Sequence, residues 1–282
     1  QRHGIPFVVF LRTSAGHSGA KYFGMIRGVV GIFFFGVQTY FISKSVGYLI
    51  RIFLFNLDQN ILDNEIFLTF YMGLNIIDWL SLIFTLVFQF LLFRKGHHFV
   101  KTFINFSGFF VYFGLFLFLI IIVSEHYLEL RNSLTEVISL ENIFLKSNIS
   151  PLIAVTGTMF AYFSIIILNI GDFSRYASSE NELKKGNLSL ILNVILFSIL
   201  ALLITLGADI ILKSNLITTE RLLTNPTDII GKINNTYLTT IALIFILVAS
   251  LSTNLIANYI PSQNSLLNFL PKQLNLNSSG LI

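Results

Sequence analysis

Long apolar runs separated by short polar segments dominate the chain. A helix needs about 20 largely apolar residues to cross the hydrocarbon core of a bilayer. Six segments meet this requirement, and the pattern therefore predicts six membrane-spanning helices, at residues 22–49, 74–93, 102–123, 151–170, 188–212 and 237–259. We accordingly predict an all-α integral membrane fold in which residues 1–282 form a single transmembrane domain.

The connections between these spans carry weaker signals. Short apolar pieces at residues 52–57 and 66–71 predict a surface loop with helical turns. Pro151 suits the first turn of the fourth span, and Pro261 is expected to end the sixth because proline disfavours helix at the residue before it. The segment after the third span is predicted to be a long loop because it contains four acidic residues, Glu125, Glu129, Glu136 and Glu141.

Basic residues gather on one side of the predicted bundle, and short loops rich in lysine and arginine face the cytoplasm. That side would hold Arg2, Arg12, Lys21, Arg94, Lys95, Lys101, Arg175, Lys184, Lys185 and Lys272. An even number of spans places both ends of the chain there too, so we expect a multi-pass protein of the cytoplasmic (inner) membrane. Gln1 is not a start residue, and residues 278–282 resemble the beginning of another apolar segment. We therefore interpret the sequence as a fragment truncated at both ends.

Composition excludes a soluble protein. Hydrophobic residues make up 54% of the chain and charged residues only 11%, whereas soluble domains carry roughly 25% charged residues. The mean hydropathy is +0.78. The net charge of +4 comes from basic residues scattered singly, so no nucleic-acid partner is expected, because such a surface needs a clustered basic patch. The absence of cysteine excludes disulfides, thiolate metal sites and cysteine nucleophiles.

Enzyme signatures are missing from the sequence. It contains no His-Glu-x-x-His, Gly-x-Ser-x-Gly or Walker loop, and we expect no enzymatic activity. His97 and His98 offer either a metal site or, in the interpretation we favour, a basic cytoplasmic turn. Asp78 and Asp209 lie near predicted span ends, where a solvated or capping role is at least as plausible as a proton relay.

Uncharged polar side chains inside the spans are candidates for function, because each needs a partner within the membrane. Phe34 and Gln38 are four residues apart and share a helix face. A flat ring stacked on Phe34 would meet the Gln38 amide with its polar edge. Alternatively, Gln38 simply bonds another helix. The same span carries Gly24, Gly28 and Gly31, which predict a close-packing strip.

The end of the fourth span is weakened as a helix by Asn169 and Gly171, and Asp172 is suited to cap a new short helix. Two interpretations stay open at this point. A broken helix at membrane depth is where transporters bind substrates and ions, and an ordinary helix end at the cytoplasmic surface gives the same pattern.

The sixth span concentrates five hydroxyl or amide side chains within residues 249–258. A hard cation such as Na⁺ prefers oxygen ligands, and Ser252, Thr253 and the Ala249 carbonyl would supply some. Hydroxyls bonded back to the preceding turn are the alternative. On an ideal helix Asn258 is about 180° from Ala249. Either the helix is therefore irregular, or it has separate ion and substrate flanks.

Four motifs, in this order along the chain, resemble the nucleobase:cation symporter family, which includes permeases for hydantoin, allantoin, uracil, cytosine and purines. The segments Gly4–Ala20, Arg27–Thr39, Asn169–Tyr176 and Ser252–Asn258 resemble, respectively, the loop before the third helix and the third, sixth and eighth helices of that family. The resemblance implies a leucine-transporter-like fold with two inverted five-helix repeats. The chain would then supply helices three to eight.

The resemblance also implies a set of site residues. Two aromatic residues that sandwich the substrate ring in the family fall at Phe34 and Phe163, although hydantoin-type members usually carry tryptophan at both positions. Polar substrate contacts fall at Gln38 and Asn258. Gly171 stands where proline is common. The implied sodium ligands are the Ala249 carbonyl and the Ser252 and Thr253 hydroxyls.

These implications combine into one functional hypothesis. We expect a monomeric secondary transporter that imports a small planar heterocycle of the allantoin, hydantoin, uracil or purine type, with Na⁺ as the coupling ion and no other cofactor. A proton-coupled cytosine or purine permease is the first alternative, although no titratable residue is evident near the site in the six spans. A non-transporting membrane sensor is the second.

Overall fold

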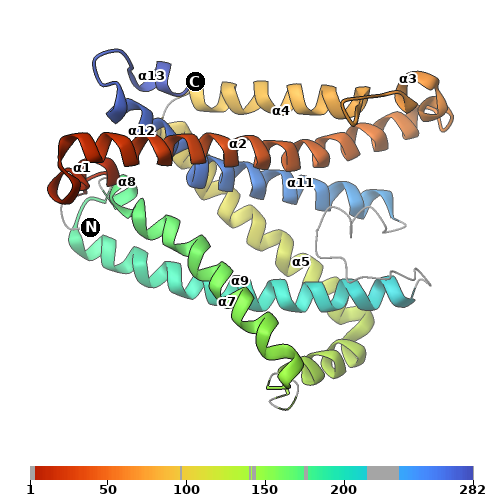
Figure 1. The fold of residues 1–282 in the computed structure, drawn as a ribbon. Coiled ribbons are helices and arrows are strands. Elements are labelled where there is room, and N and C mark those ends of the chain that lie inside the picture. Colours follow the sequence, from red (N-terminus) through yellow and green to blue (C-terminus); the bar gives the residue numbers. More distant parts are fainter. Residues whose placement is uncertain are drawn as a thin grey trace. The chain divides into compact units, whose positions relative to one another are not determined.

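The computed structural model describes residues 4–95, 97–139, 141, 144–174, 177–214 and 235–281. This part of the chain is almost entirely helical, and the predicted all-α fold is confirmed (Figure 1). Within the described residues, five helices are long and apolar enough to cross a membrane: Arg12–Leu57, Ile76–Arg94, Phe99–Ile138, Glu180–Ile211 and Thr236–Phe269. The fourth predicted span, residues 151–170, coincides for most of its length with another long helix, Lys146–Leu168. The count of six spans stays a prediction.

The helices and strands follow one another without an intervening soluble domain in the described residues. Their bounds are α1 Phe7–Phe10, α2 Arg12–Leu57, η1 Ile61–Asp63, α3 Glu65–Leu68, β1 Phe70–Tyr71, β2 Leu74–Asn75, α4 Ile76–Arg94, α5 His97–Ile138, α7 Lys146–Leu168, α8 Ile170–Ser174, α9 Glu180–Ser214, α11 Thr236–Asn254, η2 Leu255–Tyr259, α12 Ile260–Phe269 and α13 Leu276–Ser279. The two short strands pair antiparallel between α3 and α4.

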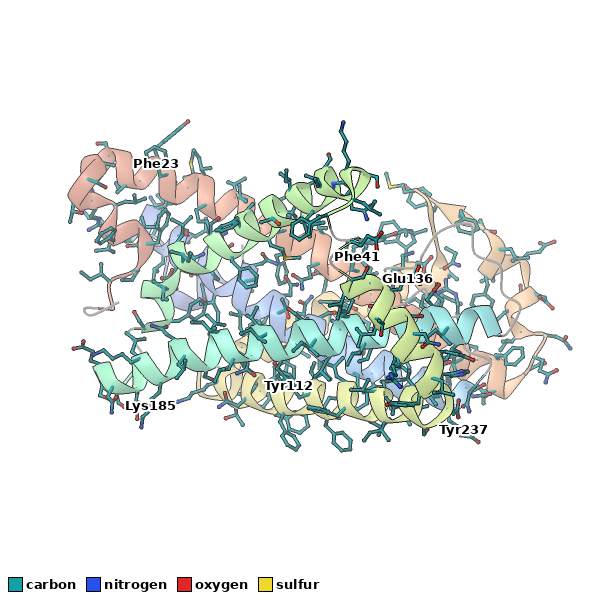
Figure 2. The ribbon with its side chains drawn as sticks, turned by 90° about the horizontal axis from the view of Figure 1, so that it is seen from below. Phe23, Phe41, Tyr112, Glu136, Lys185 and Tyr237 are labelled. Atoms are coloured by element: carbon teal, nitrogen blue, oxygen red, sulfur yellow. The ribbon has the colours of Figure 1, made fainter. Side chains whose placement is uncertain are left out.

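By its internal contacts the chain divides into two compact units, each of which is described by itself. The first comprises residues 1–26 and 115–218, and the second comprises residues 27–114 and 219–282. Bulky apolar side chains project from the helices in large numbers, and Phe41 and Tyr237 are 56% and 85% exposed (Figure 2). Such surfaces are typical of helices surrounded by an apolar solvent and not by water.

Several predicted helix boundaries are wrong, and the structure extends the helices in each case. Residues 52–57 continue α2. Three of the four acidic residues after the third span lie within α5, which bends at His126 and runs to Ile138, because glutamate is a good helix former outside the membrane. Pro151 lies inside α7, which begins five residues earlier at Lys146.

The first unit contains the break that the sequence suggested at the end of the fourth span. Helix α7 ends at Leu168, and α8 begins at Ile170. The side chains of Asn169 and Asp172 are buried, and the Asp172 amide donates to the Asn169 carbonyl over 2.9 Å. Burial favours a break inside the protein over a helix end in solvent. Arg175 and Tyr176 of the same motif lie outside the described residues.

Gly171 marks a close backbone approach within this unit. A Cβ atom added at Gly171 would overlap the backbone carbonyl oxygen of Ile5, and helix α8 also contacts α1. The atoms that this Cβ would meet belong to the backbone of Ile5 and Pro6 and not to a flexible side chain. A methyl group can therefore be accommodated only by moving the two backbones apart. Glycine is therefore required here by space, and not only by its tendency to weaken a helix.

We expect Gly171→Ala to lower the free energy of unfolding of the full-length protein by about 2 kcal/mol, because overpacking displaces backbone. Gly157→Ala on α7 is the matched control, since no atom lies within 4 Å of the added Cβ. That variant should be neutral or gain up to about 1 kcal/mol from helix propensity. Denaturant titration in mixed micelles measures both. Equal stability of the two variants would contradict the close approach.

Candidate functional site

Two of the predicted site residues meet in the second unit. Asn258 lies in η2 and Gln38 in α2, and the Asn258 Nδ2 donates to the Gln38 Oε1 over 2.9 Å. The Gln38 Nε2 in turn donates to the Ser250 carbonyl over a longer 3.4 Å. One interpretation of Gln38 was a bond to another helix, and that bond is present. The structure also joins Gln38 to the second candidate amide, 220 residues away along the chain.

A buried network of amides and hydroxyls lies behind this pair, where α2 packs beside α4 and α11 (Figure 1). Asn254 Nδ2 donates to Gln89 Oε1 over 2.9 Å and is 3.2 Å from Thr39 Oγ1. Gln89 Nε2 donates to Thr39 Oγ1 over 3.0 Å. Asn254 Oδ1 accepts from Asn258 over 2.9 Å. Thr39, Gln89 and Asn254 are each at most 1% exposed.

Sequence reasoning did not single out Gln89, Thr39 or Asn254 as site residues. Gln89 could have been found from the sequence, because it is an uncharged amide in the middle of an apolar span. Gln38 was selected by the same criterion. Thr39 and Asn254 stand inside the motifs that carry the family resemblance. Their partners could not be identified because the three residues come from helices that are distant in sequence.

The helix that carries Asn258 is irregular, which resolves one of the alternatives left open by the sequence. Residues Leu255–Tyr259 form a π-helical turn between α11 and α12, and the Ile260 amide donates to the Leu255 carbonyl five residues back. The prediction that Pro261 ends the helix is wrong, because α12 continues through it to Phe269. The wider turn accommodates a proline that lacks an N–H group and crowds the preceding turn.

Arg27 stabilises this irregular turn from α2. Pro261 has no N–H to donate to the carbonyl of Ala257, the residue four positions earlier, and the Arg27 Nη2 donates to that carbonyl over 3.2 Å. The guanidinium thus supplies a donor to a backbone carbonyl that cannot bond to the amide position four residues on. The π turn, the proline and the arginine thus fix the backbone next to Asn258.

The three predicted sodium ligands lie one turn before this irregularity. Both the Ser252 Oγ and the Thr253 Oγ1 donate to the Ala249 carbonyl over 2.9 Å. The back-bonded arrangement that was the alternative interpretation is therefore present. It also brings three neutral oxygens together on one flank of α11, and oxygens are the ligands a hard cation prefers. Sodium binding stays a prediction.

The two predicted aromatic residues fall in different units, Phe34 in the second and Phe163 in the first. Phe34 is 48% exposed and packs edge-on against Phe33, with ring centroids 5.5 Å apart. An exposed ring face on the same helix as Gln38 is suited to stacking. The sandwich of a substrate between Phe34 and Phe163 stays a prediction.

An aromatic cavity of about 400 Å³ adjoins the network in the second unit. Phe35 connects the two, because its carbonyl accepts from Thr39 and Asn254 while its ring lines the cavity. Phe93 and Tyr259 form a stacked pair in its wall, with centroids 3.6 Å apart. Neither Gln38 nor Asn258 lines this cavity, so we treat it as a neighbour of the site.

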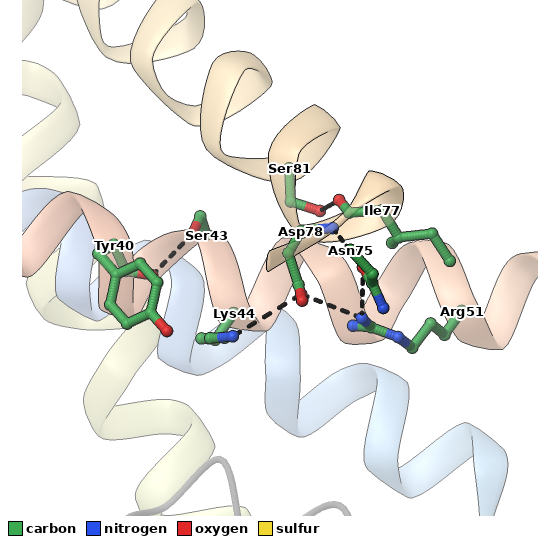
Figure 3. A network of polar contacts seen from close by, with 8 residues as sticks. All are labelled: Tyr40, Ser43, Lys44, Arg51, Asn75, Ile77, Asp78 and Ser81. Carbon is green, nitrogen blue, oxygen red and sulfur yellow. Dashed lines mark hydrogen bonds and ion pairs between the residues drawn. The ribbon is translucent and has the colours of Figure 1, made fainter. Parts of the chain in front are cut away.

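A charged cluster joins α2 to the start of α4 within the same unit (Figure 3). Asp78 is 9% exposed, and its Oδ1 accepts from the Arg51 Nη2 over 3.0 Å, with the Lys44 Nζ at 3.7 Å. Asn75 caps α4 by accepting from the Asp78 amide, and it also accepts from Arg51. Of the roles left open for Asp78, the solvated one is contradicted because the side chain is buried and ion-paired, and Asn75 acts as the cap of α4.

Comparisons with known proteins bear on the whole chain. The family described as "Permease for cytosine/purines, uracil, thiamine, allantoin" matches residues 1–282. The allantoin permease of Bacillus subtilis (strain 168) is 24% identical over 295 aligned residues, which cover 100% of this chain and 54% of that protein. The purine-uracil permease NCS1 of Arabidopsis thaliana is 31% identical over 112 residues, covering 40% of this chain and 18% of that protein. No solved structure matches.

Proposed function

This chain belongs to the family of permeases for cytosine/purines, uracil, thiamine and allantoin, and we infer that the whole protein imports a small planar nucleobase-like heterocycle. The predicted family membership is confirmed, and with it a multi-pass membrane protein. The chain spans about half the length of the allantoin permease it matches. We further propose a monomer of the inner membrane with both ends of this chain in the cytoplasm.

The observation that carries the proposal is the contact between Gln38 and Asn258. Two uncharged amides meet inside a bundle of apolar helices, where an unsatisfied polar group is costly. Their remaining donor and acceptor positions match the edge of a flat heterocycle, whose N–H and C=O groups alternate around the ring. Phe34, four residues before Gln38, offers an aromatic face on the same helix.

We propose that the heterocycle stacks on Phe34, with Phe163 on its second face, while Gln38 and Asn258 bind its polar edge. Allantoin, hydantoin, uracil and purine bases are the candidate substrates. Transport follows when one group of helices rocks against the other around this site. The Ala249 carbonyl and the Ser252 and Thr253 hydroxyls would contribute to a site for Na⁺, which supplies the driving force through reciprocal coupling of the two affinities.

Uptake by the full-length protein in proteoliposomes tests the proposal. We expect an inward sodium gradient to drive accumulation of at least one radiolabelled heterocycle among uracil, allantoin, hydantoin and a purine base. Asn258→Ala should lower its uptake at subsaturating concentration by about 100-fold, because a buried polar substrate edge is left unpaired. Uptake that is unchanged in Asn258→Ala would contradict the proposed site.

The sodium proposal has its own variants. Ser252→Ala and Thr253→Ala together should raise the sodium concentration required for half-maximal uptake at least roughly tenfold, because two hydroxyl ligands are lost. Thr240→Ala is the control, since it removes a back-bonded hydroxyl from the same helix, at the opposite end. Uptake that proceeds equally in sodium-free medium would overturn sodium coupling and leave the heterocycle site intact. A proton gradient would then be the alternative driving force.

A further inference from the structure

The buried network behind Asn258 does more than fill space. We infer that Thr39, Gln89 and Asn254 are positioning residues that hold the carboxamide of Asn258 with its oxygen available to the substrate. The inference rests on the proposed function and narrows the substrate class. The site then takes a heterocycle whose edge presents an N–H donor to Asn258 beside an acceptor for Gln38.

The direction of the network is set by the backbone carbonyl of Phe35, which can only accept hydrogen bonds. Two side-chain atoms face it, the Thr39 Oγ1 at 2.7 Å and the Asn254 Nδ2 at 3.3 Å. Both must be donors, because an oxygen without a hydrogen at either position would repel the carbonyl. The Thr39 hydroxyl proton is thus committed to Phe35, and the amide nitrogen of Asn254 must point the same way.

Each amide then fixes the next. Because the Thr39 proton is committed, its oxygen can only accept from Gln89, and the Gln89 carboxamide oxygen must therefore face Asn254. The Asn254 Nδ2 donates to it, which turns the Asn254 oxygen toward Asn258. The group of Asn258 that faces this oxygen must be its amide nitrogen. No member can flip without placing two oxygens or two N–H groups against each other.

A second backbone carbonyl enforces the same direction from the other end. The Ser250 carbonyl faces the Gln38 Nε2 at 3.4 Å, so the Gln38 oxygen points away from it and toward Asn258. Both hydrogens on the Asn258 Nδ2 are consequently engaged, one with Asn254 and one with Gln38. Two independent acceptors thus agree on a single orientation of Asn258.

The consequence is a defined pair of binding atoms. Among the residues that the structure describes, the Asn258 Oδ1 accepts no hydrogen bond, and the Gln38 Nε2 has one hydrogen beyond that given to Ser250. The site therefore offers one acceptor and one donor. A substrate edge with a ring N–H beside a carbonyl satisfies both, and an analogue methylated at that nitrogen loses the contact with Asn258.

We call the chain of hydrogen bonds that runs from Thr39 through Gln89 and Asn254 to Asn258 the relay. Thr39→Val tests it, with Thr85→Val as a matched control. The two threonines are 1% and 2% exposed, and each donates over 2.7 Å to the carbonyl four residues earlier, at Phe35 and Ser81. Only Thr39 also accepts from amides of the network. The same chemical change therefore removes the anchor of the relay in one case and an isolated hydroxyl in the other.

Two readouts on the full-length protein in detergent separate the relay from the proposed function. The first is the side-chain ¹⁵N–¹H resonance of Asn258, assigned by its loss in Asn258→Asp. We expect Thr39→Val to shift or broaden it and Thr85→Val to leave it in place. The second is the dissociation constant of the heterocycle that binds most tightly. Thr39→Val should raise it roughly tenfold, because the Asn258 carboxamide is no longer held in one orientation and a hydrogen bond to the ligand is weakened.

A double-mutant cycle distinguishes positioning from a general structural effect. In an Asn258→Ala background Thr39→Val should weaken ligand binding no further. An unchanged Asn258 resonance in Thr39→Val, or an equal loss of affinity with and without Asn258, would overturn the relay. If no heterocycle binds the wild-type protein, the proposed function fails, and the resonance alone still decides whether the relay exists.

Discussion

Asp78→Asn is expected to lower the free energy of unfolding of the full-length protein by about 3 kcal/mol, because it removes the buried carboxylate that pairs with two partly buried cations. Asp78 lies between Arg51 at 3.0 Å and Lys44 at 3.7 Å, and the side chains of these two are only 27% and 33% exposed. An asparagine keeps the shape and one acceptor but removes the charge. Denaturant titration in mixed micelles measures the loss.

Asp58→Asn is the control for this substitution. Asp58 is exposed, and its side-chain oxygen accepts a hydrogen bond from the Asn60 amide, which an asparagine oxygen accepts equally well. Its stability should change by less than about 0.5 kcal/mol. Adding Arg51→Met to Asp78→Asn should cost less than the sum of the separate changes, because the two groups interact directly. Equal effects at Asp78 and Asp58 would show that the cluster does not hold α2 against α4.

Asn254→Asp is expected to have the larger effect, a loss of about 4 kcal/mol in the free energy of unfolding, because a carboxylate replaces the donors of a fully buried amide. The Asn254 Nδ2 faces oxygens of Gln89, Thr39 and Phe35 at 2.9, 3.2 and 3.3 Å, and the residue is 0% exposed. An ionised aspartate would meet three acceptors. A protonated one would replace two N–H donors with a single O–H.

The same substitution at Asn235 supplies the comparison. Asn235 caps the start of the same helix, where its side-chain oxygen accepts from the Leu238 amide over 3.1 Å. Aspartate is as good a cap as asparagine and its charge suits a helix start. Asn235→Asp should therefore be neutral or slightly stabilising. If Asn254→Asp is tolerated as well as Asn235→Asp, the amide network does not have the direction described here.

The positions of most long helices can be predicted from the sequence because the bilayer imposes a simple rule. A helix that satisfies its own backbone must be apolar over about 20 residues, and such runs are easily located. Helix ends follow less simple rules. Residues 52–57 and the segment around Glu129 and Glu136 lie in helices, because propensity and packing extend a helix beyond its apolar part. Pro261 did not stop its helix because a π turn and Arg27 accommodate it.

The candidate site was predictable in part for a related reason. Polar residues are rare in an apolar span, so Gln38 and Asn258 stand out, and the structure joins them at 2.9 Å. Their partners were not predictable, because Thr39, Gln89 and Asn254 meet only when α2, α4 and α11 pack together. The burial of Asp78 has the same origin. A single sequence shows which residues need partners, whereas the packing of helices decides which partners they obtain.

Equilibrium binding to the purified full-length protein shows whether a heterocycle binds at Gln38 and Asn258. Uracil, allantoin, hydantoin and a purine base are titrated against the wild type and Asn258→Ala, each in sodium and in potassium, with Thr85→Val as a folded reference. We expect saturable binding of at least one heterocycle to the wild type and to Thr85→Val. That binding should be tighter in sodium and weakened about 100-fold in Asn258→Ala. Binding of the same affinity in Asn258→Ala, or no binding to the wild type, would contradict the proposed site.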